Sequence, residues 1–256
     1  DEPPAWAHEY FALAPWGRGN SGYDEFAEDD VWEAIRELKR DFKVDENRQY
    51  LTGHSMGGGG TWSIGLRTPD RWAAICVVAG GTWGTPMGIG LGRNAAHLPV
   101  RIWHGETDGA ISVEEARQMQ AELRRYGSEP DVILVPDQGH SYPQEARREN
   151  IRWLLKHERQ RPKAFAYVCD TWRHRGVWGV WMERDVSVEP FPRFECRIEG
   201  SKVYVNSHGT PGLDVGLGEG GLGLSGPVTV FWNGKEAYEG EARQITLGTG
   251  GGWRPD

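Results

Sequence analysis

The residues of this 256-residue sequence best suited to chemistry are a serine between two glycines, followed later by an acid and a histidine. The serine is the centre of Gly53-His54-Ser55-Met56-Gly57, which matches the Gly-x-Ser-x-Gly pattern of a nucleophile on a sharp strand-to-helix turn. Such a turn needs small residues two positions before and after the serine, because larger side chains would collide there. We therefore predict that Ser55 is a nucleophile.

A serine hydroxyl is a weak nucleophile until a base takes its proton and an acid orients that base. In chains with this turn the acid comes first and the histidine second, each after a strand. The expected strand at residues 100–103 leads to Asp108, and the one at 132–135 leads to His140. The sequence predicts Asp108 as the acid and His140 as the base, with Glu106 as the alternative acid.

Attack on an ester or amide carbonyl also requires two N–H donors for the oxyanion. The backbone N–H of Met56, directly after the nucleophile, is the expected first donor. His54 is expected to point away from Ser55 and to line the pocket. His104, within a predicted strand, is interpreted as structural.

The elements that must position these residues are an alternation of short apolar runs and amphipathic stretches over residues 9–157. This pattern favours parallel strands covered by helices. Strands are predicted at residues 10–14, 48–52, 73–79, 100–103 and 132–135. Helices are predicted around 31–38, around 113–123 with a capping box opened by Ser112, and around 151–155 with Pro143 in the first turn.

From about residue 162 the helical period ends, and 17 of the 36 glycines lie beyond this point. Short strands are predicted at residues 164–168, 177–182, 194–198, 203–205 and 228–232. Asn233-Gly234 indicates a type I′ hairpin, and 216–226 is expected to be a flexible loop. We predict an α/β catalytic domain at 1–160 and a small all-β, sandwich-like module at 161–256.

Composition excludes several other classes of protein. The net charge is −8 and no Lys/Arg stripe is present, which argues against nucleic-acid binding. No stretch approaches eighteen apolar residues, and residues 1–4 do not begin a signal peptide. Three cysteines without a Cys-x-x-Cys pair argue against a metal site, and Cys169 and Cys196 are the candidate disulfide. Localisation stays open, with a secreted or periplasmic protein favoured.

Residues 14–23, 45–58 and 104–108, completed by His140, resemble the α/β-hydrolase superfamily. More narrowly, they are similar to its prolyl-oligopeptidase-like and feruloyl-esterase-like branch. Polyester hydrolases and cutinase-like enzymes share the His-Ser-Met-Gly-Gly stretch. The resemblance covers about residues 9–157. It implies a mostly parallel sheet flanked by helices, and a serine carboxylic-ester hydrolase that forms an acyl-enzyme without metal or cofactor.

The chain departs from that superfamily at its beginning. Members have a hairpin and a further strand before the one expected at 10–14, so about 80 to 100 residues have no counterpart here. The further strand carries the second oxyanion donor. The chain is a fragment, or a homodimer partner or another segment completes the sheet, or residues 10–14 pair directly with 48–52. We favour the last, with an oxyanion hole that is either incomplete or rebuilt from the Trp16-Gly17 loop.

The expected substrate follows from the segment at 79–99, where such enzymes insert lids. It holds about twenty glycine-rich residues, so we expect an open site. Trp16, Trp83 and Tyr142 flank the catalytic loops and, with His54, are the predicted substrate-binding residues. An aromatic cleft suits a feruloyl or aryl ester, a polyester or another polymeric, plant-cell-wall ester. The alternatives are an oligopeptidase-like serine peptidase and a catalytically weak scaffold whose β module binds polysaccharide.

Overall fold

The computed structural model describes residues 10–17, 19, 21–23, 25–83, 90–183 and 191–248. The first part contains a four-stranded sheet in which every neighbouring pair is parallel. The strands follow in spatial order as β1 (Tyr50–His54), β2 (Ala74–Val78), β3 (Val100–Gly105) and β4 (Asp131–Val135). The expected parallel α/β architecture is confirmed in this part of the chain.

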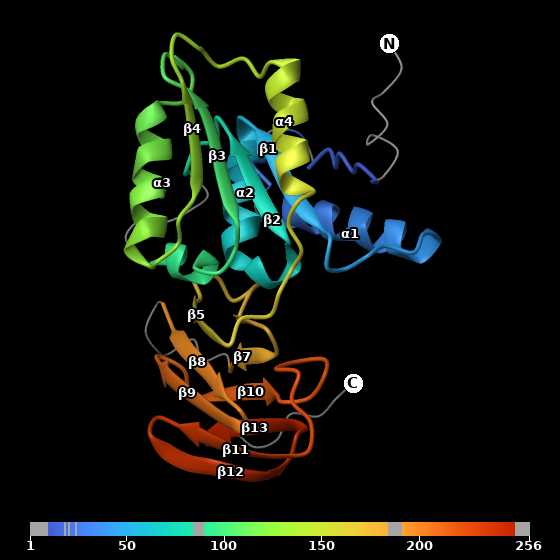
Figure 1. The fold of residues 1–256 in the computed structure, drawn as a ribbon, viewed down its shortest axis with the longest axis vertical. Coiled ribbons are helices and arrows are strands. Elements are labelled where there is room, and N and C mark those ends of the chain that lie inside the picture. Colours follow the sequence, from blue (N-terminus) through green and yellow to red (C-terminus); the bar gives the residue numbers. More distant parts are fainter. Residues whose placement is uncertain are drawn as a thin grey trace.

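Helices cover both faces of this sheet, as Figure 1 shows. They are α1 (Phe26–Asp41), α2 (Met56–Arg67), the short η2 (Pro69–Arg71) and η3 (Leu91–Ala95), α3 (Val113–Arg125) and α4 (Gln144–Leu154). Ile75 and Val77 face α1, α2 and α3, whereas Cys76 and Val78 share a cluster with Leu154 of α4. Strand β2 is an unbroken apolar run because both of its faces are covered. None of the described helices is both long and apolar enough to cross a membrane.

The predicted strand at 10–14 is not present. Residues 11–14 have no regular secondary structure, and Phe11 and Leu13 are exposed. The expectation that this segment pairs with the Ser55 strand is therefore wrong. A run of apolar residues has the composition of a strand, but it forms one only where a partner strand takes up its N–H and C=O groups. Among the described residues, β2 is the only strand that pairs with β1.

The C-terminal part consists of two facing sheets, as the sequence predicted. The larger has the order β12 (Lys235–Glu241), β11 (Pro227–Trp232), β9 (Lys202–His208), β8 (Arg193–Glu199) and β5 (Ala164–Val168). The smaller has the order β13 (Gln244–Gly248), β10 (Gly212–Gly216), β7 (Val180–Met182) and β6 (Gly176–Val177). One apolar cluster includes residues of both sheets, such as Val203 and Val215.

Local details of this module differ from the sequence prediction at three places. The strand expected at 177–182 is a hairpin, because Trp178 and Gly179 both have positive φ and reverse the chain. The loop at 216–226 is compact, since Leu217 and Leu222 are buried. All three cysteines carry free thiols, so the candidate disulfide is absent. The Asn233-Gly234 hairpin is confirmed, with φ of 49° and 79°.

The two parts meet through buried polar contacts at the edge of the sheet where its strands begin. Arg67, at the end of α2, forms a bidentate ion pair with Asp170, and their side chains are only 10% and 4% exposed. The Tyr167 hydroxyl donates to the Arg67 carbonyl. The Asn94 amide bridges the carbonyls of Leu66 and Val168. These bonds fix the β module to the far end of the helix that starts after Ser55.

We expect Asp170→Asn to lower the free energy of unfolding by about 3–5 kcal/mol, because it leaves the Arg67 charge buried without its partner. Urea denaturation measures this change. The matched control is Glu33→Gln, which breaks an Arg36–Glu33 pair whose side chains are both 66% exposed. It should cost less than about 1 kcal/mol. Equal effects of the two substitutions would contradict the structural importance of this contact.

Candidate active site

Ser55 is the single residue between β1 and α2, and its backbone is strained. Its φ of 57° and ψ of −116° lie outside the regions that a residue with a side chain prefers. Such a conformation costs of order 1–3 kcal/mol and persists only where the surroundings impose it. Here the Ser55 N–H donates to the Val78 carbonyl at 3.0 Å, and its own carbonyl accepts from Gly59 at 3.0 Å.

The glycines around Ser55 are needed for a close approach of backbone to backbone. A Cβ atom at Gly53 would lie 2.2 Å from the Gly57 carbonyl oxygen. A Cβ atom at Gly58 would lie 2.6 Å from Gly80 Cα, so α2 packs directly on the end of β2. At Gly57 a Cβ atom meets nothing within 4 Å. The predicted need for a small residue thus applies before the serine, at Gly53, and not at Gly57.

The structure brings the three residues of the predicted triad together. His140 follows β4, and its Nε2 lies 2.7 Å from Ser55 Oγ. Its Nδ1 lies 2.7 Å from Asp108 Oδ2. Because an ionised carboxylate only accepts hydrogen bonds, His140 donates from Nδ1, which leaves Nε2 to accept from the serine hydroxyl. The alternative acid, Glu106, instead pairs with Arg117 at 3.5 Å.

The environment of Asp108 keeps its carboxyl ionised. The side chain is fully buried, and burial alone would raise its pKa. The backbone N–H groups of Ile111 and Ala110 and the His140 ring donate to the carboxylate and together lower the pKa below its ordinary value. His104 Nε2 lies 3.3 Å from the carboxylate and 3.0 Å from the Ile111 carbonyl, consistent with a structural histidine.

His54 supports His140 directly. Its Nε2 donates to the His140 carbonyl at 2.8 Å, and the two ring centroids are 4.9 Å apart. Burial lowers the pKa of His54, and the bond to the His140 carbonyl offsets this effect only in part. A neutral ring with its proton on Nε2 therefore fits both observations. The sequence indicated only a pocket residue here, and no pattern in it revealed this bond.

The aromatic residues predicted to bind substrate have different surroundings. Tyr142 packs against Trp103 and accepts a hydrogen bond from Asn150 at 2.8 Å, and burial raises its pKa to about 12. Trp83 is 55% exposed, and its ring lies over Gly59 in the first turns of α2. Trp16 is 83% exposed. Of the three, Trp83 has the clearest contact with the helix that begins after Ser55.

Glu115 is the third residue after Ser112, the position that a capping box would give to a glutamate. Ser112 caps α3 by accepting from the Glu114 N–H, as a capping serine should. Glu115 does not complete the expected capping box. Its carboxylate instead accepts from the backbone N–H of Thr82 at 2.6 Å and from the Thr82 hydroxyl at 2.9 Å. It thereby holds the segment that carries Trp83. Residues 84–89 of the expected open lid segment lie outside the described residues.

The Met56 N–H lies at the start of α2, where helix N–H groups have no partner within the helix and favour negative charge. The Trp16-Gly17 turn packs on the same helix through Tyr23. A Cβ atom at Gly17 would lie 2.5 Å from the Tyr23 ring, and one at Gly60 would lie 2.8 Å from it. The second oxyanion donor in this turn stays a prediction. No cluster of metal-binding side chains occurs among the described residues.

The chain is similar in sequence to several hydrolases. The model of the dienelactone hydrolase family matches residues 16–174. The chain is 27% identical over 211 residues to the uncharacterized peptidase YuxL of Bacillus subtilis, covering 63% of this chain and 30% of that protein. It is 28% identical over 105 residues to the probable feruloyl esterase C of Aspergillus clavatus, covering 39% and 35%. It thus spans about a third of the length of either relative.

The crystal structure of a thermostable esterase is similar to about half of this chain. Its sequence identity is 26% and its TM-score is 0.46, over 53% of this chain and 38% of that one.

We expect Gly53→Ala to lower Tm and to slow phosphonylation of Ser55 by a fluorophosphonate, because the new methyl group would displace the Gly57 backbone. Gly57→Ala is the matched control. It should leave Tm unchanged or raise it, since alanine is favoured over glycine within a helix by up to about 1 kcal/mol. Thermal unfolding and intact-mass labelling measure the two effects. Equal losses at the two positions would refute the proposed close contact.

We expect His54→Ala to slow the phosphonylation of Ser55 by about tenfold, because the base loses the bond that fixes its backbone. His54→Gln retains a side-chain N–H and should recover part of this rate. Thermal unfolding of both variants tests whether the loss is local. A His54→Ala protein that labels at the normal rate would show that His54 does not position His140.

Proposed function

Because the chain belongs to the dienelactone hydrolase family, within the α/β-hydrolase superfamily, we propose that it is a serine carboxylic-ester hydrolase acting through an acyl-enzyme on Ser55. The observation that carries the proposal is the continuous chain of hydrogen bonds from Ser55 to His140 to Asp108, with both distances at 2.7 Å. A strained serine joined to a buried, ionised acid through one imidazole is the arrangement that activates a hydroxyl.

In the proposed mechanism Ser55 Oγ attacks the ester carbonyl carbon while its proton moves to His140 Nε2. Negative charge develops on the carbonyl oxygen and is stabilised by the Met56 N–H at the start of α2. His140 then gives the proton to the leaving alkoxide, and the ester bond breaks to leave an acyl-serine. Water repeats the sequence on the acyl group and regenerates Ser55. Asp108 stabilises the charged imidazole in both halves.

We favour a feruloyl or aryl ester, or a polyester, as the substrate. The exposed Trp83 ring beside the first turns of α2 gives an aromatic acyl group a surface on which to pack. The likeness to a probable feruloyl esterase agrees with this assignment. The likeness to YuxL keeps a serine peptidase as the second candidate. A binding protein with weak catalysis is the third, and the intact hydrogen-bond chain argues against it.

The test combines active-site labelling with a substrate panel. A fluorophosphonate should add once to the folded protein, and Ser55→Ala should abolish the adduct, whereas Ser201→Ala, in an exposed turn, should keep it. The ester kcat/KM should fall by at least about a thousandfold in Ser55→Ala and His140→Ala. Folded protein that takes no label would favour the binding protein.

The panel contains p-nitrophenyl acetate, methyl ferulate and a Gly-Pro amide. Hydrolysis of both esters with a preference for methyl ferulate is the expected result. A higher kcat/KM for the Gly-Pro amide than for either ester would replace the esterase by the peptidase.

A further inference from the structure

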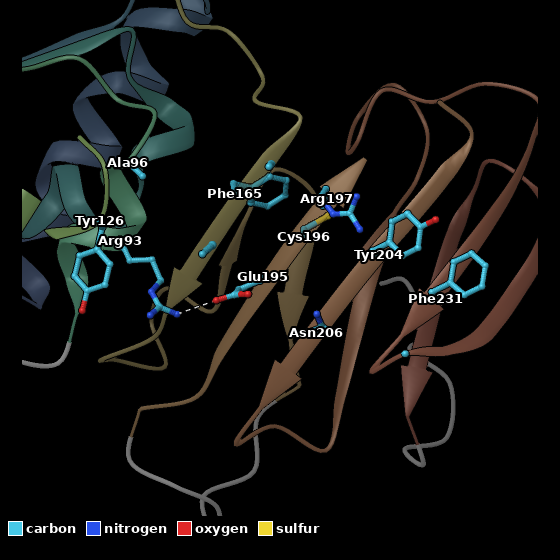
Figure 2. A pocket seen from close by; sticks show the side chains of 13 residues that line it. Arg93, Ala96, Tyr126, Phe165, Glu195, Cys196, Arg197, Tyr204, Asn206 and Phe231 are labelled. Carbon is cyan, nitrogen blue, oxygen red and sulfur yellow. Dashed lines mark hydrogen bonds and ion pairs between the residues drawn. The ribbon is translucent and has the colours of Figure 1, made fainter. Parts of the chain in front are cut away.

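A second surface of this chain has the shape and the side chains of a binding site. A groove of about 580 Å³ lies between the outer face of the larger β sheet and the α/β part. Figure 2 shows Arg93 and Tyr126 on the α/β side, Arg93 joined to Glu195 of the β module, and Tyr204 and Phe231 on strands farther from the α/β part. The mechanism proposed above uses none of these residues.

The groove lies at the opposite edge of the parallel sheet from Ser55. The three triad residues follow the carboxyl ends of β1, β3 and β4. Tyr126 follows the end of α3, and Arg93 lies in η3, which leads into the start of β3. Since α3 runs back from the carboxyl edge to the amino edge, both groove residues lie at the amino edge. A ligand bound here would be separate from the catalytic centre.

Three flat side chains form a row across neighbouring strands on the floor of the groove. Arg197 of β8 pairs in register with Tyr204 of β9, which pairs with Phe231 of β11. The Arg197 guanidinium lies 4.4 Å from the Tyr204 ring centre. The rings of Tyr204 and Phe231 have centroids 5.1 Å apart and are inclined by only 12°. Phe231 and Arg197, on the strands to either side of β9, therefore cover the two faces of the Tyr204 ring, and the row presents ring edges and the Tyr204 hydroxyl to a ligand.

Polar groups surround this row without partners of their own. Asn206 is exposed on the outer face of β9, two residues after Tyr204 on the same strand. Within the described ranges, neither the Asn206 amide nor the Tyr204 hydroxyl makes a side-chain hydrogen bond. Aromatic surface with a few free donors and acceptors suits a ligand that has C–H faces and hydroxyl groups. Sugar rings have both.

The charges of the groove argue against a polyanion. Arg93 pairs with Glu195 at 3.2 Å, and Arg197 pairs with Glu199. Each guanidinium is therefore matched by a carboxylate, which removes the excess of positive charge that nucleic acids or acidic polymers require. The lining includes no leucine, isoleucine, valine or methionine, so its large apolar side chains are all aromatic.

We propose that this groove binds a neutral polysaccharide and anchors the protein to it. Sugar rings lie against the exposed edges of the Tyr204 and Phe231 rings, and their hydroxyl groups bond to Asn206, Glu195 and the Tyr204 hydroxyl. The Arg93–Glu195 pair joins the two walls, so both parts of the chain contribute to the site. Because the test measures binding and needs no turnover, its outcome is independent of the ester hydrolysis proposed above.

The test is affinity electrophoresis in native gels cast with arabinoxylan, mixed-linkage β-glucan or starch. The Ser55→Ala protein is used so that the polymer stays intact. At least one neutral polymer should retard it, and adding Tyr204→Ala and Phe231→Ala should weaken the affinity about tenfold, since these two rings form the floor of the groove. Thr229→Ala, two residues from Phe231 on the same strand, is the matched control and should not change retardation.

Thermal unfolding checks that the double substitution folds. Asn206→Ala, at an exposed position, gives a second and milder test and should also weaken binding. In a protein that retains Ser55, the Tyr204→Ala and Phe231→Ala double substitution should leave hydrolysis of p-nitrophenyl acetate unchanged.

Absence of retardation by every neutral polymer would overturn the proposal, as would retardation that persists in the folded double variant. Retention by polygalacturonate or DNA alone would show a charge-driven surface instead. A dimer in sedimentation velocity that the double substitution converts to a monomer would assign the groove to self-association.

Discussion

The strained backbone of Ser55 must be held by rigid contacts, and the packing of the α/β part provides them. Some of these contacts are made without side chains, because Gly53, Gly58 and Gly80 let β1, α2 and the end of β2 approach within backbone distance. A helix held so closely at its first turn transmits any displacement to the serine. The position of the end of α2 therefore affects the position of Ser55 as well. Arg67 joins that end to Asp170, and the β module thereby becomes part of the framework that keeps the proposed nucleophile, Ser55, in place.

The acid and the base are held by the same principle. The loops that carry Asp108 and His140 are also hydrogen-bonded to each other through their backbones. The Thr107 N–H donates to the Gln138 carbonyl at 3.1 Å. A Cβ atom at Gly105 would lie 2.1 Å from the Gln138 carbonyl oxygen, so the two loops are in direct backbone contact. His54 then ties the His140 carbonyl back to the nucleophile's own strand. The three proposed catalytic positions thus form one connected unit. The side-chain hydrogen bonds gain their precision from backbone contacts between loops that are distant in the chain.

These features differ in how far the sequence predicts them. The strands that end before Ser55, Asp108 and His140 are short apolar runs followed by turn residues, so local pattern is enough to place all three at one sheet edge. The bonds of His54 and Glu115 depend on which loop lies opposite, and local pattern does not contain that information. The prediction of a strand at 10–14 was wrong for the same reason. An apolar run forms a strand only where a partner strand lies beside it, and local pattern does not show that partner. The hairpin at Asn233-Gly234 was predictable because its two positive φ angles are a local property.

The arrangement of the two parts separates catalysis from contact with the rest of a substrate. Among the described residues, several buried bonds attach the β module at the amino edge of the sheet, including Asn94 to Val168 and Trp178 to Asp70, and His174 bonds to Glu28 of α1. The catalytic edge is therefore not covered by the module, and it stays free for the loop that carries Trp83. A polymer held in the groove at the amino edge would reach Ser55 only by extending around the α/β part or from a neighbouring strand of the polymer. Such a geometry would raise the local concentration of ester groups without covering Ser55, which is the physical advantage of an anchor over a longer active-site cleft.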